Sequence, residues 1–261
     1  MKQAVVVIGM GEIGSVLARG LLKTGHPVYP ITREMDIAEQ VKHITDPAAV
    51  IVAVGESDLH SMLSSIPEAW QKNLVLIQNE LLPRDWQQYD FPAPTIVSVW
   101  FEKKKGQDVK VVVPSPMHGP QAQLLFDAFQ SLDIPAEIIK DDEQMTAELV
   151  RKNYYILCSN IAGLKTGGTV GELWANHQDF AKKVLIDIHE IQQYLVDGTL
   201  DNEALTKAML VAFEGDLDHG CMGRSAPARL ARAIQIADDA GLTITTLREI
   251  AEQSANRKHR K

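Results

Sequence analysis

Three glycines near the start of the chain have the spacing of a phosphate-binding turn. Gly9, Gly11 and Gly14 spell G-x-G-x-x-G directly after the apolar run 4–8. The first glycine permits a tight turn, the second lets the backbone approach a pyrophosphate, and the third lets a helix pack closely on a strand, with its free N–H groups facing the phosphates. The alternative is that these glycines serve only the turn and its packing. The expected cofactor-binding residues are Gly9, Met10, Gly11, Glu12, Ile13 and Gly14.

The end of the next strand is where such a site distinguishes its cofactors. An acidic residue there binds the ribose 2′-hydroxyl of NAD, whereas an arginine pairs with the 2′-phosphate of NADP. This chain has Thr32 and Arg33 at that position, followed by Glu34. We therefore expect NADP, bound through Thr32 and Arg33, in preference to NAD. A solvated surface arginine is the alternative reading of Arg33.

A nicotinamide enzyme that reduces a carbonyl also needs a proton donor and groups that hold the substrate. The segment 148–163, ELVRKNYYILCSNIAG, places Lys152 about two helical turns before Asn160 on a helix with an apolar face. Partial removal from water lowers the pKa of a lysine and makes proton donation easier. From spacing alone, the alternative is an exposed helix lysine beside Arg151.

The elements that must position these residues alternate between strand and helix in the first half of the chain. Short apolar, β-branched runs predict strands, and apolar residues at helical spacing between them predict helices, a pattern typical of a parallel sheet covered on both faces. The expected strands lie at 3–9, 28–32, 48–55, 73–79, 95–100, 108–113 and 136–139, and the expected helices follow residue 13, span 57–66 and span 120–132.

The pattern changes at about residue 141, after which helix-length segments follow one another. They begin with acidic or Ser/Asn residues, and most end at glycine. These segments are 141–163, 179–198, 201–215 and 225–241. We therefore predict an α/β fold in two domains: a dinucleotide-binding Rossmann domain at 1–140 with a doubly wound parallel sheet, and an all-helical substrate and catalytic domain at 141–261.

Composition limits the partners and the compartment. The formal net charge of −8 disfavours nucleic acid and anionic lipid as partners, and the basic run 257–261 is interpreted as a disordered solubilising tail. Cys158 and Cys221 lack C-x-x-C spacing, which indicates a reducing compartment. The run 4–8 is too short for a signal peptide or a membrane span. We expect a cytoplasmic protein, monomeric or homodimeric, that binds no membrane and acts on a small molecule.

The chain resembles the ketopantoate reductase (2-dehydropantoate 2-reductase) family over nearly its full length. The segments that carry the resemblance are 5–33, 50–55, 76–80 and 151–164. The resemblance implies an NADP-dependent enzyme with a Rossmann domain and a helical C-terminal domain. It also implies roles for three residues: Asn79, from the family's Q-N-G motif, binds substrate and nicotinamide; Lys152 protonates the nascent alkoxide; and Asn160 is the second asparagine of the family's K-x-x-x-N-x-x-x-N motif.

The cofactor half matches this family better than the substrate half. Glu80 replaces the glycine of Q-N-G, Ile156 replaces the first asparagine of the lysine motif, and Gly55 stands where the family has a second lysine. The family's C-terminal glutamate and serine align near Pro227 and Gly215.

Arg224 and Ser225 remain as candidates to bind a substrate carboxylate. The alternative is that they cap the helix that starts near Pro227.

Three polar constellations are set aside. The loop 215–223 holds Asp216, Asp218, His219 and Cys221, but mixed hard and soft ligands at adjacent spacing suit no common metal, so we predict no metal site. His118, in a proline-glycine stretch, is interpreted as a loop residue. The stretch 165–174 is interpreted as a flexible connection, because it lacks the order of a P-loop.

These residues and the resemblance together imply an NADP-dependent oxidoreductase that reduces a small, ketopantoate-like 2-oxo acid to a 2-hydroxy acid, with the proton from Lys152. Asn79, Asn160, Arg224 and Ser225 are the expected substrate-binding residues. Two alternatives remain: a related reductase acting on another carbonyl or an imine, and an NADP-binding sensor or scaffold without turnover.

Overall fold

The chain divides into two units inside helix α7 (Asp142–Thr166). In the computed structural model, which describes residues 2–258, the first unit is Met1–Leu149 and the second is Val150–Lys261. The boundary proposed at residue 140 falls just before the start of this helix.

The first unit is built on a seven-stranded sheet with the order β2-β1-β3-β4-β5-β8-β9. Its neighbouring strands run parallel, except that β5 and β8 are antiparallel. Strands β1 and β3, which are interior strands of the sheet, are fully buried, as their continuous apolar sequences predict. The strands are β1 Val5–Ile8, β2 Val28–Ile31, β3 Ala49–Val52, β4 Leu74–Leu76, β5 Thr95–Val97, β8 Ser115–His118 and β9 Ala136–Ile138.

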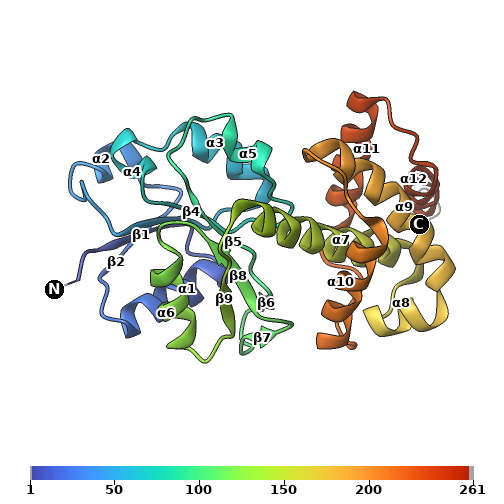
Figure 1. Cartoon of the computed structure of the whole chain (residues 1–261), viewed down its shortest axis with the longest axis horizontal. Helices are drawn as coiled ribbons and strands as arrows, with labels where there is room; N and C mark the ends of the chain where they lie inside the picture. The colour runs from blue at the N-terminus through green and yellow to red at the C-terminus, as the bar shows by residue number, and fades with distance from the viewer. Residues whose placement is uncertain (1, 259–261) are drawn as a thin grey trace. The chain divides into compact units, whose positions relative to one another are not determined.

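Helices cover both faces of this sheet (Figure 1). Helices α1 and α6 lie on one face, while α2, α3, α4 and α5 lie on the other. At Gly20 of α1, an added Cβ would lie 2.5 Å from the backbone oxygen of Ala128 in α6, so only glycine permits this close helix packing. The helices are α1 Glu12–Lys23, α2 Ile37–Gln40, α3 Leu59–Ser64, α4 Glu68–Gln71, α5 Pro83–Gln87 and α6 Ala122–Gln130, with a 3₁₀ turn η1 at Glu56–Asp58. The predicted doubly wound α/β fold is confirmed.

The edge strand β2 is regular despite its proline. The backbone oxygens of Pro27 and Ile31 accept hydrogen bonds from Val5 and Gly9 at 2.8 and 3.0 Å. Because successive residues of a strand face opposite directions, Pro30 turns its backbone away from β1. A residue without an N–H group is therefore tolerated there.

Two segments of this unit differ from the prediction. Of the expected strand 108–113, only Lys110–Val111 forms a strand, β7, which pairs with β6 (Phe101–Glu102) in a separate two-stranded sheet. His118 is not a loop residue: it is the last residue of β8, because the main sheet extends through this proline-containing stretch.

The second unit is helical, as predicted. Helix α9 packs against α8, α10, α11 and α12. The carboxylate of Asp187 in α9 accepts a hydrogen bond from the backbone N–H of Leu247 at 2.9 Å and so holds the first turn of α12. After α7, the helices are α8 Val170–Asn176, α9 Gln178–Leu195, α10 Asn202–Gly215, α11 Ala226–Ala240 and α12 Thr245–Lys258.

The stretch 165–174 is not the flexible connection that was expected. Thr169 and Glu172 form a reciprocal capping box that starts α8, with the Thr169 N–H donating to Glu172 at 2.9 Å. The basic run 257–261 was predicted to be a disordered tail, but its first two residues, 257 and 258, belong to helix α12. The last three residues of the run lie outside the described residues.

Within residues 2–258, no helix combines the length and the apolar composition that crossing a bilayer requires.

Candidate active site

The glycine motif forms the turn that joins β1 to α1. Gly9 has a φ of 95°, and an added Cβ there would lie 2.7 Å from the backbone oxygen of Ala53. A Cβ on Gly14 would lie 2.1 Å from the backbone oxygen of Gly9. The fold itself therefore requires glycine at both positions. The turn lies at the carboxyl end of β1, between β2 and β3 in the sheet, where the direction of winding reverses and ligands of such sheets bind.

Gly11 is different, because the fold does not require it. Its φ of −72° and ψ of −167° suit any residue, and a Cβ there would meet no atom within 4 Å. Gly11 is the residue immediately before α1, so the unpaired N–H groups of the first helical turn follow it. Packing therefore does not explain this glycine. Its position at the N-terminus of a helix fits a site where a phosphate approaches the backbone.

The other residues of the turn are open to solvent or partly buried. Met10 is 39% exposed, Glu12 is exposed and Ile13 is partly buried. The Glu12 carboxylate lies 3.3 Å from the ammonium of Lys103, which offsets its negative charge next to the helix N-terminus.

The residues expected to choose the cofactor follow the neighbouring strand β2. Thr32 and Arg33 are exposed, and a guanidinium nitrogen of Arg33 lies 3.5 Å from the carboxylate of Asp58. A hydrogen bond from the Thr32 side chain lowers the pKa of Glu34 most. The backbone of Glu34 and the charge of Arg33 also lower this pKa, by smaller amounts. The ion pair of Arg33 is weak and exposed, so exchanging it for a contact to a phosphate costs little.

Asn79 follows β4 at the same edge of the sheet. It is partly buried, and the next residue, Glu80, has a φ of 60°. Gln78 fixes the start of this turn by donating to the backbone oxygen of Val52 at 2.6 Å and by accepting from the N–H of Ile77 at 3.1 Å. The glycine turn, Arg33 and Asn79 are thus all carried by carboxyl ends of parallel strands.

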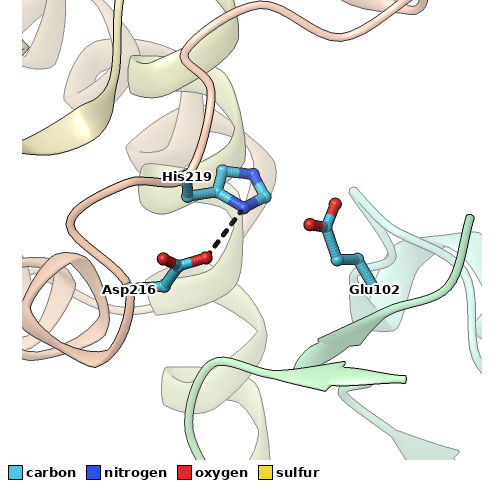
Figure 2. Close-up of side chains that lie close together, drawn as sticks. All are labelled: Glu102, Asp216 and His219. Carbon is cyan, nitrogen blue, oxygen red and sulfur yellow. Dashed lines mark ion pairs between the residues drawn. The ribbon is translucent and has the colours of Figure 1, made fainter. Parts of the chain in front are cut away.

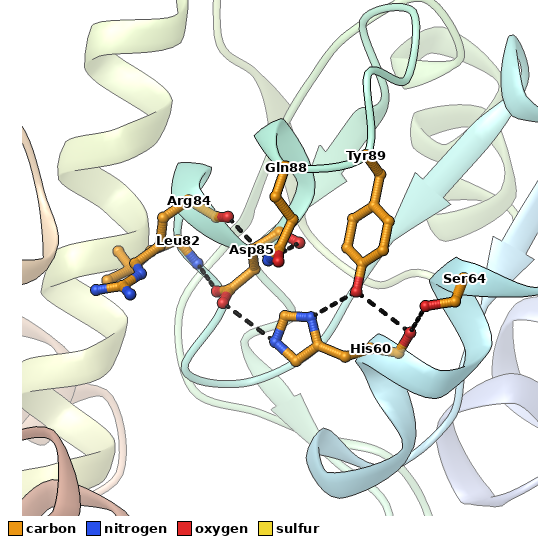
Figure 3. A network of polar contacts seen from close by, with 7 residues as sticks. All are labelled: His60, Ser64, Leu82, Arg84, Asp85, Gln88 and Tyr89. Atoms are coloured by element: carbon orange, nitrogen blue, oxygen red, sulfur yellow. Dashed lines mark hydrogen bonds and ion pairs between the residues drawn. The ribbon is translucent and has the colours of Figure 1, made fainter.

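A polar network holds the helix that follows Asn79 (Figure 3). The Asp85 carboxylate accepts from the N–H of Leu82 at 2.8 Å and lies 3.6 Å from Nε2 of His60 in α3. The other ring nitrogen of His60 lies 3.0 Å from the hydroxyl of Tyr89. Burial raises the pKa of Asp85, an effect that the Leu82 N–H and His60 oppose. This network ties α5 to α3 and so fixes the far end of the turn that holds Asn79.

Lys152 lies in the part of α7 that belongs to the helical unit. It is partly buried, and its pKa falls from the usual 10.5 to about 7, first through burial and then through the positive charges of Arg229 and Arg151. A lysine with this pKa exchanges its proton near neutral pH, as a general acid must.

Asn160 is buried two turns further along α7 and contacts an arginine that the sequence analysis missed. The Oδ1 atom of Asn160 accepts a hydrogen bond from Nη1 of Arg229 at 3.0 Å. Arg229 is only 8% exposed, although it is charged. The signal that could have found it is its position in α11, where Ala226 and Leu230 form a buried apolar face.

Arg224 and Ser225 lie just before α11. Arg224 is exposed and Ser225 is partly buried. Ser225 occupies the N-cap position of α11, but its hydroxyl makes no capping hydrogen bond. Substrate binding by Arg224 and Ser225 stays a prediction.

The loop before α11 packs against α7. An added Cβ on Gly163 would lie 2.3 Å from the backbone oxygen of Cys221, so glycine permits the contact. In the same loop, Nδ1 of His219 lies 3.7 Å from the Asp216 carboxylate (Figure 2).

Cys158 and Cys221 are both buried free thiols, and burial raises the pKa of Cys221 to about 11. These thiols are therefore protonated at neutral pH.

His118 faces a cavity of about 600 Å³ in the first unit. Its Nδ1 lies 2.8 Å from the backbone oxygen of Ile139, and its Nε2 lies 3.2 Å from the Asp142 carboxylate. The aromatic residues Trp86 and Phe91 line the same cavity.

The solved structures that resemble this chain include ketopantoate reductases and a dehydrogenase. A probable 2-dehydropantoate 2-reductase from Bacillus subtilis shares 17% identity, with 97% of this chain and 99% of that chain covered and a TM-score of 0.69. A dimeric ketopantoate reductase from Staphylococcus aureus shares 16% identity, with 98% and 99% covered and a TM-score of 0.63. A D-mandelate dehydrogenase, solved with NADH and anilino(oxo)acetate, shares 12% identity, with 98% of each chain covered and a TM-score of 0.68.

No protein-family model matches the sequence, and no curated protein matches it in sequence. The resemblance to ketopantoate reductases stated above is confirmed at the level of the fold.

Proposed function

We propose that the protein is an NADP-dependent oxidoreductase that reduces a small, ketopantoate-like 2-oxo acid to a 2-hydroxy acid. The observation that carries the proposal is Lys152, a partly buried lysine whose pKa of about 7 suits proton donation at neutral pH. NADPH, when bound, supplies the hydride for the carbonyl carbon. Lys152 donates its proton to the carbonyl oxygen as that oxygen becomes negative, and in the reverse direction it takes the proton back.

The residues of the first unit fit the dinucleotide. Gly11 leaves room for a pyrophosphate beside the backbone, and the first turn of α1 supplies N–H donors. We infer that Thr32 and Arg33 hold the 2′-phosphate of NADP and that Asn79 orients the nicotinamide and the substrate.

The test of the reaction follows the absorbance of NADPH with purified protein and a panel of 2-oxo acids that includes ketopantoate. Turnover of at least one acid is expected, and Lys152→Met should lower the rate by about 10²–10⁴-fold while leaving NADPH affinity unchanged. Lys183→Met, which removes an exposed lysine of α9, is the matched control. Tight NADPH binding without turnover of any 2-oxo acid would contradict the proposal and favour an imine, another carbonyl or a binding role.

The test of cofactor choice compares NADPH with NADH. Arg33→Gln should weaken NADPH binding by roughly tenfold, because it removes a charge-assisted contact to the 2′-phosphate, and should leave NADH binding unchanged. Arg19→Gln, which removes an exposed arginine of α1, is the control. Equal losses for both dinucleotides would mean that Arg33 does not recognise the 2′-phosphate.

A further inference from the structure

The cavity that His118 faces lies within the first unit, at the edge of the sheet opposite the glycine turn. Ala93 and Pro94, which directly precede β5, line the cavity together with His118 at the end of β8. Strand β5 is parallel to β4, so it begins at the amino edge of the sheet, and β8 is antiparallel to β5, so it ends at the same edge. Dinucleotides bind such sheets at the carboxyl edge. The cavity is therefore separate from the site that the glycine turn forms.

The interior of this cavity is apolar. Ile96, Met145 and Leu149 line it, and each is at most 3% exposed. Trp86 and Phe91 add two aromatic side chains to the lining. The volume of about 600 Å³ lies in the range that small-molecule sites occupy. Flat, apolar walls of this kind favour a ligand with an aromatic body.

The ring of Phe91 is held in place from behind. It stacks on the ring of Tyr89, with the two centroids 5.4 Å apart and an angle of 12° between the rings. The hydroxyl of Tyr89 in turn lies 3.0 Å from Nδ1 of His60 (Figure 3). A wall that is already ordered costs a ligand little conformational entropy on binding.

The polar end of the cavity presents two hydrogen-bond acceptors to each other. Nδ1 of His118 lies 2.8 Å from the backbone oxygen of Ile139, which can only accept, so Nδ1 carries the hydrogen of the neutral ring. Nε2 of that ring is then an acceptor, and it lies 3.2 Å from the carboxylate of Asp142. A donor is needed between them, either a second proton on the ring or an N–H group of a ligand. An ammonium has three donors and can serve both acceptors.

The charges around the cavity also favour a cation. Asp90 and Asp142 both line it, and no lysine or arginine of the described chain does so. We propose that this cavity binds an aromatic amine, with the ring against Trp86 and Phe91 and the ammonium between Nε2 of His118 and the carboxylate of Asp142. This second site does not depend on the reaction proposed above.

The experiment titrates tryptamine calorimetrically into the purified full-length protein. Indole-3-propionate, which has the same ring and the opposite charge, is the control ligand. Tryptamine should bind with a stoichiometry of one, and Asp142→Asn should weaken it by about three- to tenfold. Trp86→Ala should weaken it by roughly tenfold. Asp127→Asn, which removes the same charge from an exposed position of α6, should leave the affinity unchanged.

Two further measurements locate the ligand. His118→Asn lacks an atom equivalent to Nε2 but keeps a donor for the Ile139 oxygen, so it should fold and bind tryptamine more weakly; thermal unfolding checks the fold of each variant. Saturating NADPH should leave the tryptamine affinity unchanged, because the dinucleotide edge is the opposite one.

The proposal would be overturned by an absence of saturable tryptamine binding, by equal binding of the two indoles, or by competition with NADPH. An affinity that Asp142→Asn or Trp86→Ala leaves at the wild-type value would overturn it as well.

Discussion

Burial of the Lys152 ammonium makes the stability of the protein depend on pH in a defined window. In the folded protein the pKa of Lys152 is about 7, whereas in the unfolded chain it has its usual value of 10.5. Between these values the unfolded chain holds a proton that the folded protein has released, so the free energy of unfolding rises with pH from about 7 to about 10.5. Below pH 7 both the folded and the unfolded protein hold the proton, so the folded protein bears the full free-energy cost of burying the Lys152 ammonium.

The size of the effect follows from the two pKa values. A tenfold change in a protonation constant equals about 1.4 kcal/mol, so the full cost of the buried ammonium is on the order of 5 kcal/mol. Lys152→Met removes this cost and keeps an unbranched side chain. The stability gained by Lys152→Met should therefore be greatest at about pH 6 and smaller by roughly 2–3 kcal/mol at about pH 9.

The assay is urea unfolding of the wild type and Lys152→Met at both pH values, followed by circular dichroism. Lys183→Met, at an exposed position of α9, should differ from the wild type by the same small amount at both. A difference between Lys152→Met and the wild type that stays constant from pH 6 to pH 9 would refute the reasoning, because the ammonium would then not be destabilised by the fold.

Two glycine contrasts test the packing that surrounds the proposed site. Gly11→Ser should leave stability unchanged, because a Cβ there meets no atom within 4 Å. It should weaken NADPH binding by tenfold or more, since a side chain that enters filled space typically costs about 1–3 kcal/mol. Calorimetric titration measures the NADPH affinity, and an unchanged affinity would mean that no phosphate approaches Gly11. Gly163→Ala should destabilise the protein by about 1–3 kcal/mol in urea, because its Cβ would lie 2.3 Å from the Cys221 oxygen. Gly220→Ala, with open space around it, is the control, and equal effects of the two would contradict the close packing of α7 on this loop.

Most of the α/β unit could be predicted because local pattern and tertiary structure agree there. The continuous apolar runs became β1 and β3, and the helical spacing after Gly11 became α1. Strand β8 could not be predicted, because Pro116 indicates a turn. In the sheet, Pro116 contributes only its oxygen, which accepts from the N–H of Ser98 at 2.9 Å, so its missing N–H group is not needed.

The candidate site was predictable where its chemistry is local. The glycine turn depends on residues that are neighbours in sequence. Arg229 depends on a contact with Asn160, 69 residues away, which no local pattern contains. The backbone of Glu80 is left-handed, with a φ of 60°, a conformation that glycine adopts without strain and a residue with a side chain disfavours. The sequence motif alone did not show that this chain adopts that turn with a glutamate.

The outward-facing backbone of Pro30 also limits how copies of the chain can assemble. An edge strand with free N–H and C=O groups is a template onto which another chain can add a strand, and a proline on that side removes a donor from the template. A second copy that added a strand to β2 would lose a hydrogen bond in the middle of the four-residue ladder. Self-association through this edge, whether as a sheet continuous across two molecules or as a growing fibre, is therefore disfavoured, and any homodimer is expected to form through side-chain surfaces elsewhere.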